Sequence, residues 1–516
     1  MPFLTRSHPL RNDYANSNSH TGSDSGSGSA LPNANEKPKT ELKPEDVASE
    51  LPFAYSRRKK WLILCVVFLV QVSMNLNTTL YSNGIPGIAK EFGVTEEAAR
   101  WGAAAFLIAY AFGCELWAPW SEEFGRKIIL QCSMFMVNVF GILATVAPNF
   151  GAILAARTLG GICTAGGSVT LAIITDMFDS HDDDFQYATA FIVFSSVGGS
   201  IFGPIVGGFI EEYADWRYTG VVQVAFGFAI ALLHLFTPET RTTSVLDKIA
   251  KKKRASDPAC NIYGPGELKK KKTDWAEVGR IWIRPFIMFV TEPIVLSLSL
   301  LSGFSDALIF MQVQAFGLIY QQWGFGPINI GLAFIPLFLG YVAAWVLFIP
   351  FYRRNMAARK ADPSNEHAQY EARLKPLLYL APCLPVGLII FGWTSGGPPV
   401  HWAGTMVGSF IIGIANYAVY ASTIEYMVRA YGAEYSASAT GGNGWARDFL
   451  AGVLTVPAVP FYTNIAADKG LNFQIASTIL FGISLLLVGA VFWVYFKGAS
   501  LRRRSKFAQE LADEGN

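Results

Sequence analysis

Charged residues are scarce in this chain. Asp, Glu, Lys and Arg make up 16% of its 516 residues, whereas 52% are hydrophobic and 14% aromatic. An ordinary soluble chain carries about 25% charged residues, so this one has too few to cover several soluble domains. The shortage excludes a disordered protein and a nucleic-acid-binding protein, and it predicts a chain whose main solvent is lipid.

Catalytic and metal-binding patterns are also missing. The six cysteines form no CxxC pair and five of them lie in apolar stretches, which is typical of packing residues in helices. The sequence has no GxxxxGK[ST] loop, no HExxH and no GxSxG, and its isolated Ser, His and Asp residues define no triad. We therefore expect no enzyme, no ATP-driven pump, no bound metal and no cofactor.

Long apolar segments are what the chain does have. A membrane-spanning helix needs about 20 mostly apolar residues, and six such segments precede the middle of the chain while six follow it. They predict an all-α integral membrane protein with twelve transmembrane helices in two six-helix halves. The segments are 61–82, 101–120, 128–147, 151–176, 186–210, 216–236, 288–319, 328–350, 376–394, 401–428, 436–463 and 473–496.

Polar stretches divide the chain into five expected parts. The first is rich in Ser, Asn, Gly and Pro and predicts a disordered tail, while the middle one carries KKKR at 251–254 and KKKK at 269–272, which predicts contact with anionic lipid headgroups. In order, the parts are a cytoplasmic tail, a six-helix bundle, a basic cytoplasmic linker, a second six-helix bundle and a second cytoplasmic tail, at residues 1–58, 59–237, 238–285, 286–497 and 498–516.

Lys and Arg are distributed unevenly over the alternate loops. Most of the 41 lie on one side of the predicted membrane. Because cytoplasmic loops carry the excess of cations, we expect both termini in the cytoplasm. The plasma membrane is the expected location and the vacuolar membrane is the alternative. The exceptions in the opposite loops are Lys90, Arg100, Arg217 and Lys469, and the exceptions within spans are Arg157 and Arg447.

The loop after the second apolar segment reads APWSEEFGRK, at 118–127. Here the sequence resembles the major facilitator superfamily, whose corresponding loop follows G-x-L-x-D-R-x-G-R-R. Glu122 stands in the place of the family Asp, and Gly125, Arg126 and Lys127 match the end of the pattern, while Glu123 replaces the family Arg. The resemblance implies that these residues hold helix ends together in one conformation.

Two further stretches are similar to patterns of that family. Arg157 and Gly161 match R-x-x-x-G, and the resemblance implies a role for Arg157 in proton coupling; a purely structural ion pair is the alternative. An Arg within a span costs at least roughly 2.5–3.5 kcal/mol, so it should face the interior and find a partner. The fifth segment matches the antiporter pattern G-x-x-x-G-P-x-x-G-G with Gly199, Gly203, Pro204, Gly207 and Gly208.

The spacing within that pattern has structural consequences. Gly199, Gly203 and Gly207 fall on one helix face, where a neighbouring helix can approach closely, and Pro204 permits a bend. Three other stretches, PET at 238–240, TEPIVLSLSLLSGFSDALIF at 291–310 and GGNGWARDF at 441–449, resemble fungal drug:proton antiporters with twelve helices.

Acidic residues within the predicted spans are the candidates for proton coupling. An acidic side chain in an apolar cavity can exchange a proton, or it can pair with a cationic substrate. Arg447 and Asp448 are neighbours and point about 100° apart, so Arg447 is expected to pair across helices. The coupling candidates are Glu115, Asp306 and Glu425 together with Arg157, and Asp448 also lies within a span.

Polar and aromatic stripes predict where a substrate would bind. Gln71, Asn75 and Thr78 fall on one face of the first span, and the adjacent Asn77 stands where related antiporters have an Asp. Two further pairs are expected in the cavity: Phe310 with Gln314, on the face of Asp306, and Asn416 with Tyr420.

These observations and the resemblance together predict a secondary transporter. We expect a monomer that exports a hydrophobic drug, toxin or secondary metabolite in exchange for protons by alternating access, with the bilayer as its surroundings and no nucleic-acid partner. A polyamine or organic-cation transporter is the main alternative. A ligand sensor that transports nothing is a further one.

Overall fold

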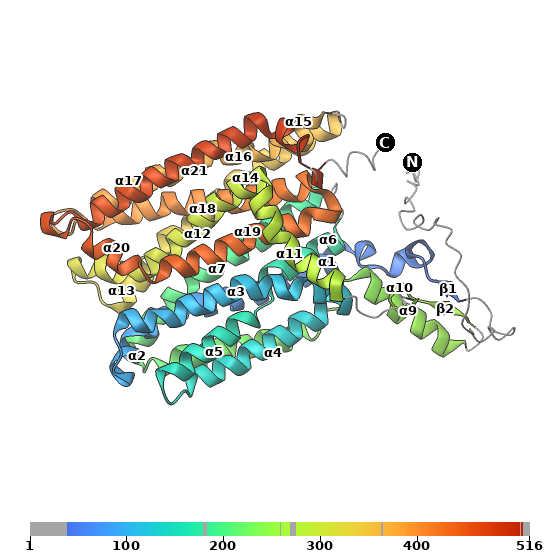
Figure 1. The fold of residues 1–516 in the computed structure, drawn as a ribbon, viewed down its shortest axis with the longest axis horizontal. Coiled ribbons are helices and arrows are strands. Elements are labelled where there is room, and N and C mark those ends of the chain that lie inside the picture. Colours follow the sequence, from blue (N-terminus) through green and yellow to red (C-terminus); the bar gives the residue numbers. More distant parts are fainter. Residues whose placement is uncertain are drawn as a thin grey trace, which may run out of the picture.

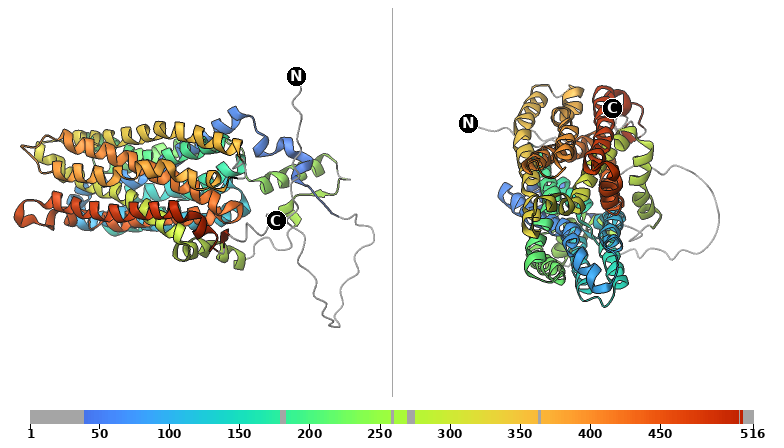
Figure 2. Two further views of the ribbon diagram at one scale, coloured as in Figure 1. Left: turned by 90° about the horizontal axis from the view of Figure 1, so that it is seen from above. Right: turned by 90° about the vertical axis from the view of Figure 1, so that its left-hand side faces the viewer.

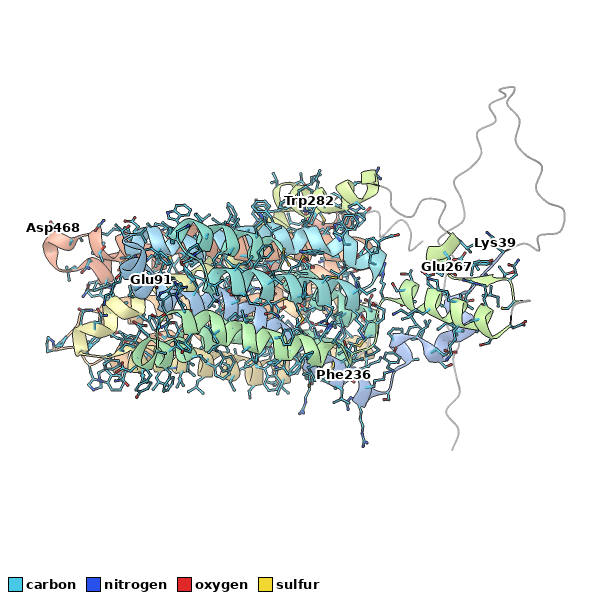
Figure 3. All side chains as sticks on the ribbon, turned by 90° about the horizontal axis from the view of Figure 1, so that it is seen from below. Lys39, Glu91, Phe236, Glu267, Trp282 and Asp468 are labelled. Atoms are coloured by element: carbon cyan, nitrogen blue, oxygen red, sulfur yellow. The ribbon has the colours of Figure 1, made fainter. Side chains whose placement is uncertain are left out.

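The computed structural model describes residues 39–178, 183–257, 260–268, 275–362, 365–505 and 507–508. Long helices run side by side along one direction (Figure 1). Lys39 and Glu267 lie in a projection at one end, and Asp468 lies at the other (Figure 3). We name the first the basic end, because it carries Arg126, Lys127 and the described part of the central linker, and the second the far end.

The first half of the chain contributes a bundle in which α1 packs on α7, α3 on α5, and α4 on α8. Its helices are α1 (Arg57–Thr79), α2 (Ile85–Phe92), α3 (Glu96–Phe124), α4 (Arg126–Thr145), α5 (Phe150–Ile162), α6 (Gly166–Met177), α7 (Asp183–Tyr213) and α8 (Arg217–His234).

The second half contributes a bundle in which α12 packs on α19, α14 on α18, and α17 on α18 and α21. Its helices are α12 (Pro293–Tyr320), α13 (Pro327–Leu332), α14 (Ile335–Ala361), α15 (Glu366–Gln369), α16 (Lys375–Leu380), α17 (Cys383–Thr394), α18 (Ala403–Ala430), α19 (Gly432–Thr455), α20 (Ala458–Asn464) and α21 (Asn472–Arg502).

Seen along the helices, the two bundles lie next to each other, with the orange and red helices above the blue and green ones (Figure 2). Most of the contacts between them are made by α3 with α19 and by α7 with α13, α14 and α18, and α6 also contacts α19. One apolar core even crosses the boundary, since Ala190, Val193, Val197 and Ile201 of α7 belong to the core of the second bundle. We call this boundary the seam.

Eleven segments within the described residues are long and apolar enough to cross a membrane. Of the twelve expected spans, α19 is the one that is not apolar enough to be counted, because it carries Asn443, Arg447 and Asp448. It is nevertheless packed between α12 and α3, so its polar residues face protein rather than lipid. This twelfth long helix can therefore lie within the membrane without being highly apolar, because other helices cover it.

Five expected spans are interrupted, two of them, at 328–350 and 376–394, by two-residue turns at 333–334 and 381–382. The segment predicted at 151–176 is two helices, because the chain leaves helical geometry at Cys163–Ala165 before α6 begins. The segment predicted at 288–319 starts only at Pro293, since Glu292 before this proline is extended. The eleventh, predicted at 436–463, ends at Thr455, and a separate α20 follows Pro457.

The prediction of a disordered tail over residues 1–58 is wrong for its last part. Strand β1 (Thr40–Glu41) pairs in parallel with β2 (Ile262–Tyr263), and Leu42, Val47 and Leu51 are buried against α9 (Thr242–Ser256). Two other linker helices are described, α10 (Pro265–Leu268) and α11 (Trp275–Thr291). Residues 1–38 and the KKKK run at 269–272 lie outside the described residues.

Candidate functional site

Glu115 is a buried carboxylate at the seam. It lies in α3 and is only 3% exposed, and its Oε1 accepts a 2.8 Å hydrogen bond from the Ser168 hydroxyl of α6. No ion pair reaches Glu115 from any residue that the structure describes. A charged carboxylate without a cation is costly in such surroundings, so Glu115 is suited to exchange a proton.

The opposite side of the seam is shaped to fit this carboxylate. A Cβ atom on Gly441 of α19 would overlap the Glu115 carboxylate, and a Cβ on Gly452 would stand 2.8 Å from Ile108 of α3. Gly441, Asp448 and Gly452 share one face of α19, because they are spaced by seven and four residues. A second carboxylate, Asp448, therefore faces α3 between these two close contacts.

The interrupted helix places Ser168 beside Glu115. The break at Cys163–Ala165 lets α6 begin at Gly166, in the interior of the bundle, so Ser168 lies in its first turn. Helix N-termini carry unpaired N–H groups and a partial positive charge. The charged form of Glu115 is thus supported by a hydroxyl and a helix end.

A cavity of about 590 Å³ leads from this region toward the basic end. Ser168 lines it together with residues of α3, α6, α7, α18 and α19, so both bundles contribute to its wall. At the far end the halves touch, since a Cβ on Gly208 would stand 2.6 Å from the Pro327 carbonyl and one on Gly331 would stand 2.6 Å from that of Pro204. Gln314 also donates a 3.0 Å hydrogen bond to Ser82 there.

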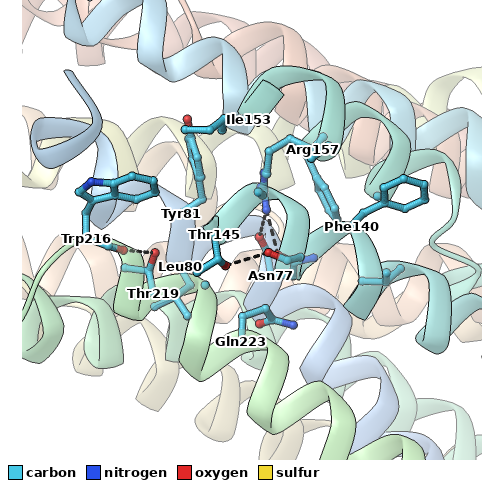
Figure 4. Close-up of a pocket in the computed structure, with 17 residues that line it drawn as sticks. Asn77, Leu80, Tyr81, Phe140, Thr145, Ile153, Arg157, Trp216, Thr219 and Gln223 are labelled. Atoms are coloured by element: carbon cyan, nitrogen blue, oxygen red, sulfur yellow. Dashed lines mark hydrogen bonds between the residues drawn. The ribbon is translucent and has the colours of Figure 1, made fainter. Parts of the chain in front are cut away.

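Arg157 lies in the interior of the first bundle beside a small pocket (Figure 4). It donates to the Asn77 side chain at 2.8 Å and backbone carbonyl at 3.0 Å, and to the carbonyl of Gly102 at 3.2 Å. Its guanidinium also stacks on Tyr81 and Phe106. The structural alternative for Arg157 expected an ion pair, yet within the described ranges its side-chain partner is Asn77, the amide that stands where related antiporters have an Asp.

Asp306 and Arg447 form an ion pair inside the second bundle. Arg447 Nη2 lies 2.8 Å from Asp306 Oδ1, and both side chains are about nine-tenths buried. The Arg447 guanidinium also lies over the Tyr420 ring, 3.4 Å from its centroid. Arg447 therefore pairs across helices as its sequence position suggested, and Asp306 is neutralised by a permanent cation.

Glu425 is also paired, which leaves it less free to exchange protons than its place in the sequence suggested. Arg373 Nη1 lies 2.7 Å from Glu425 Oε1, and neither side chain is more than 3% exposed. Gln186 of α7 donates to the same oxygen across the seam, and Arg359 of α14 donates to the side-chain amide oxygen of Gln186 at 3.1 Å. This set joins the two halves near the basic end.

The glycine pattern of α7 is used for close packing on two sides. Gly199 faces Asn75 and Val72 of α1, and Cβ atoms on Gly203 and Gly207 would overlap Thr79 and Asn83. Pro204 lies within a continuous α7, and it and Gly208 face α13 of the other half. Gly161 plays the same part between α5 and α3, where a Cβ would stand 2.9 Å from that of Ala109.

The loop after α3 forms a network at the basic end. Arg126 is buried and donates to Asp176 at 3.0 Å and to Ser121 at 2.6 Å, while Glu122 lies 3.9 Å away. Glu239 accepts from the backbone N–H groups of Arg126 and Lys127 at 2.9 and 3.2 Å. Gly125 has φ +100°, and any Cβ there would overlap Glu239.

The remaining cavity candidates lie in different settings. Gln71 reaches across helices, to Ser196 and Thr170, whereas Asn75 and Thr78 donate to carbonyls of their own helix. Phe310 packs against Leu107 across the seam, and Asn416 donates to Ser305 at 3.0 Å within its own bundle. Gln71 of the first half and Tyr420 of the second both bond to Ser196 of α7, which places these two candidates at one point of the seam.

Sequence reasoning missed several functional partners. Ser168, Gln186 and Arg373 gave no local signal, because each acts on a carboxylate far away in the chain. Gly166-Gly167, ahead of Ser168, was a visible hint of a helix break. Glu239 belongs to the PET stretch. It caps the start of α4 because the chain that follows α8 passes beside that helix end.

Membrane-length helices in two bundles, with buried charges and a cavity at the seam, define an integral membrane carrier. The profile of the Major Facilitator Superfamily matches residues 67–456. The chain belongs to this superfamily and is a transporter of that type.

Curated relatives and solved structures agree with this assignment. The chain is 30% identical over 463 residues to the MFS-type transporter paaT of Penicillium rubens, covering 89% of this chain and 82% of that protein. It is 30% identical over 469 residues to the MFS-type efflux pump MFS2 of Trichophyton rubrum (89% and 76%) and 28% over 466 residues to the efflux pump FUB11 of Gibberella moniliformis (89% and 76%).

Two solved structures share the fold at 15% identity. One is the human organic anion transporter MFSD10, with a TM-score of 0.53 over 83% of this chain and 99% of that one. The other is the proton:xylose symporter XylE, with a TM-score of 0.54 over 84% of this chain and 95% of that one.

Proposed function

We propose that this transporter exports a hydrophobic drug, toxin or secondary metabolite in exchange for protons. The observation that carries the proposal is Glu115, a buried carboxylate at the seam with a hydroxyl partner, no ion pair within the described ranges, and a cavity wall beside it. Export is supported by the relatives, two of which are named efflux pumps.

The proposed cycle follows from this placement. With the basic end in the cytoplasm, as the cation distribution favours, the cavity receives substrate from the cytoplasm or the inner leaflet. Rocking of the two halves then exposes the seam to the other side, where a proton binds to Glu115 and substrate leaves. The protein is proposed to act as a monomer with both termini in the cytoplasm, in the plasma membrane.

Transport by purified protein in liposomes tests the proposal. Vesicles with an acidic lumen should accumulate a neutral apolar toxin, such as radiolabelled cycloheximide, only while the pH gradient lasts. Nigericin with potassium, which collapses the gradient, should abolish the accumulation. Uptake that is the same with and without the gradient would remove the claim of proton coupling.

Export of an organic cation is the second candidate. It is favoured by the two carboxylates, Glu115 and Asp448, that face the same stretch of the seam, because a cationic substrate could pair with them. Radiolabelled spermidine in the same vesicles distinguishes the two cargoes. Competition between spermidine and the neutral toxin would show that one site accepts both.

A further inference from the structure

A groove at the basic end crosses the seam on the side of α1, α7 and α14. It has a volume of about 700 Å³ and is open to the surface. Lys60 in the first turn of α1 and Asp184 in the first turn of α7 come from one half, and Arg353 and Met356 of α14 come from the other. It lies apart from Glu115 and from the cavity beside it, with the exception of Phe178, which lines both spaces.

The charges in the groove are unbalanced. Its carboxylate, Asp184, is already occupied by Arg57 through hydrogen bonds of 2.8 and 2.9 Å. Lys60 is 91% buried, yet among the described residues its ammonium has only the ring of Phe178 as a partner, at 4.9 Å. Arg353 is exposed and has no ion pair within the same ranges. Two cations, one of them buried, therefore face the groove without a counter-charge from the described residues.

The groove is continuous with the surface that faces lipid. Val346, which lies two turns before Arg353 on the same face of α14, is 51% exposed. Phe178 and Met356 supply apolar walls next to the cations. An occupant with an anionic head and apolar tails would pair with the cations and pack against the apolar walls. Basic pockets between membrane helices favour acidic phospholipids.

We propose that this groove binds the phosphate headgroup of an anionic phospholipid from the leaflet at the basic end. The phosphate lies between Lys60 and Arg353, so one lipid molecule is held by both halves of the transporter. Its binding stabilises the arrangement in which α1 and α7 lie close to α14. This role is separate from proton coupling and does not depend on the substrate.

Native mass spectrometry of the full-length protein in detergent tests the site. Titration with phosphatidylinositol 4-phosphate should give a saturable one-lipid complex, whereas phosphatidylcholine should not. Lys60→Gln with Arg353→Gln should weaken that complex at least fivefold. The matched control is Arg58→Gln with Arg354→Gln, which removes the same charge from neighbouring exposed positions and should leave the complex unchanged.

Other outcomes of these titrations distinguish a specific lipid site from a diffuse basic surface and from a site for soluble anions. Equal weakening by both double variants would overturn the proposal in favour of a diffuse basic surface. Full competition by millimolar inorganic phosphate would show a site for soluble anions instead of a lipid. Arg353→Gln alone changes an exposed residue and will fold, so its partial weakening of the complex is required even if the Lys60 variant is unstable.

Discussion

The carboxylate of Glu115 and the hydroxyl of Ser168 meet at 2.8 Å, where a helix of the first bundle begins in the middle of the fold. The hydrogen bond lies against Gly441 of the other bundle, which leaves no room for a side chain. A titratable group is thus placed where the two halves must separate. Movement of the halves and protonation of Glu115 can therefore influence each other.

Gly441→Ala should impair transport by crowding this carboxylate. The added Cβ would overlap Glu115, so the acid must leave Ser168 or the halves must separate. We expect transport to fall at least fivefold in the liposome assay while the protein remains folded. Gly444→Ala on the same helix is the control, because nothing lies within 4 Å of its Cβ. Equal activity of the two variants would speak against tight packing at Glu115.

Glu425→Gln or Arg373→Gln alone should destabilise the protein strongly. Each change leaves a buried partner charge without compensation, at a cost of about 3–5 kcal/mol, whereas the double variant should lose less than the two singles combined. Unfolding temperatures in detergent will measure this coupling. Arg503→Gln, which removes an exposed pair with Glu366, should cost at most about 1 kcal/mol. Additive losses in the double variant would contradict the pairing.

Asn77→Asp should raise the unfolding temperature. The new carboxylate would sit 2.8 Å from Arg157, which lacks an acidic partner among the described residues and has an unbonded Nη2. A hydrogen bond to a charged group contributes about 1.5–3 kcal/mol. Asn75→Asp, two residues away, is the control and should be destabilising, because Asn75 bonds to the Gln71 carbonyl and a carboxylate there would be unpaired. A lower unfolding temperature for Asn77→Asp would be evidence against this account of Arg157.

The module of tail and linker should loosen in acid. Hydrogen bonds from Arg254 lower the pKa of Glu267 from its ordinary value. A carboxyl with a lowered pKa in the folded state contributes stability above its ordinary pKa, and that contribution is lost as the pH falls through the lower value. Hydrogen exchange at the Leu42 amide, which bonds to the Tyr263 carbonyl, should therefore speed up in acid beyond the intrinsic change. Glu267→Gln should make that exchange fast at neutral pH as well and remove this dependence on pH.

Much of the architecture was predictable from the sequence, because apolar length and the placement of cations depend on local composition. The two halves follow from the count of apolar segments, and α19 was found by its place in that series despite its polar residues. The close packing of Gly199, Gly203 and Gly207 follows from their spacing. The short strands β1 and β2 were not predictable, since two residues each give no periodic pattern.

The candidate site was only partly predictable, because charge pairing depends on residues distant in the chain. Glu425 and Asp306 look equivalent to Glu115 in the sequence, and only the positions of Arg373 and Arg447 distinguish them. Asn77 was recognised as a missing acid, yet its bond to Arg157 required the packing of α1 against α5. Glu115 remains as the coupling candidate without an ion pair in the part of the chain that the structure describes.

The most direct test of the central claim is pH-gradient-driven transport by Glu115→Gln. Glu97→Gln, an exposed change on the same helix, serves as the matched control. We predict that Glu115→Gln still binds substrate and exchanges it across the membrane at equilibrium, but no longer concentrates it when the lumen is acidic, whereas Glu97→Gln behaves like the unaltered protein. Undiminished accumulation by Glu115→Gln would contradict the assignment of Glu115 as the proton-carrying group.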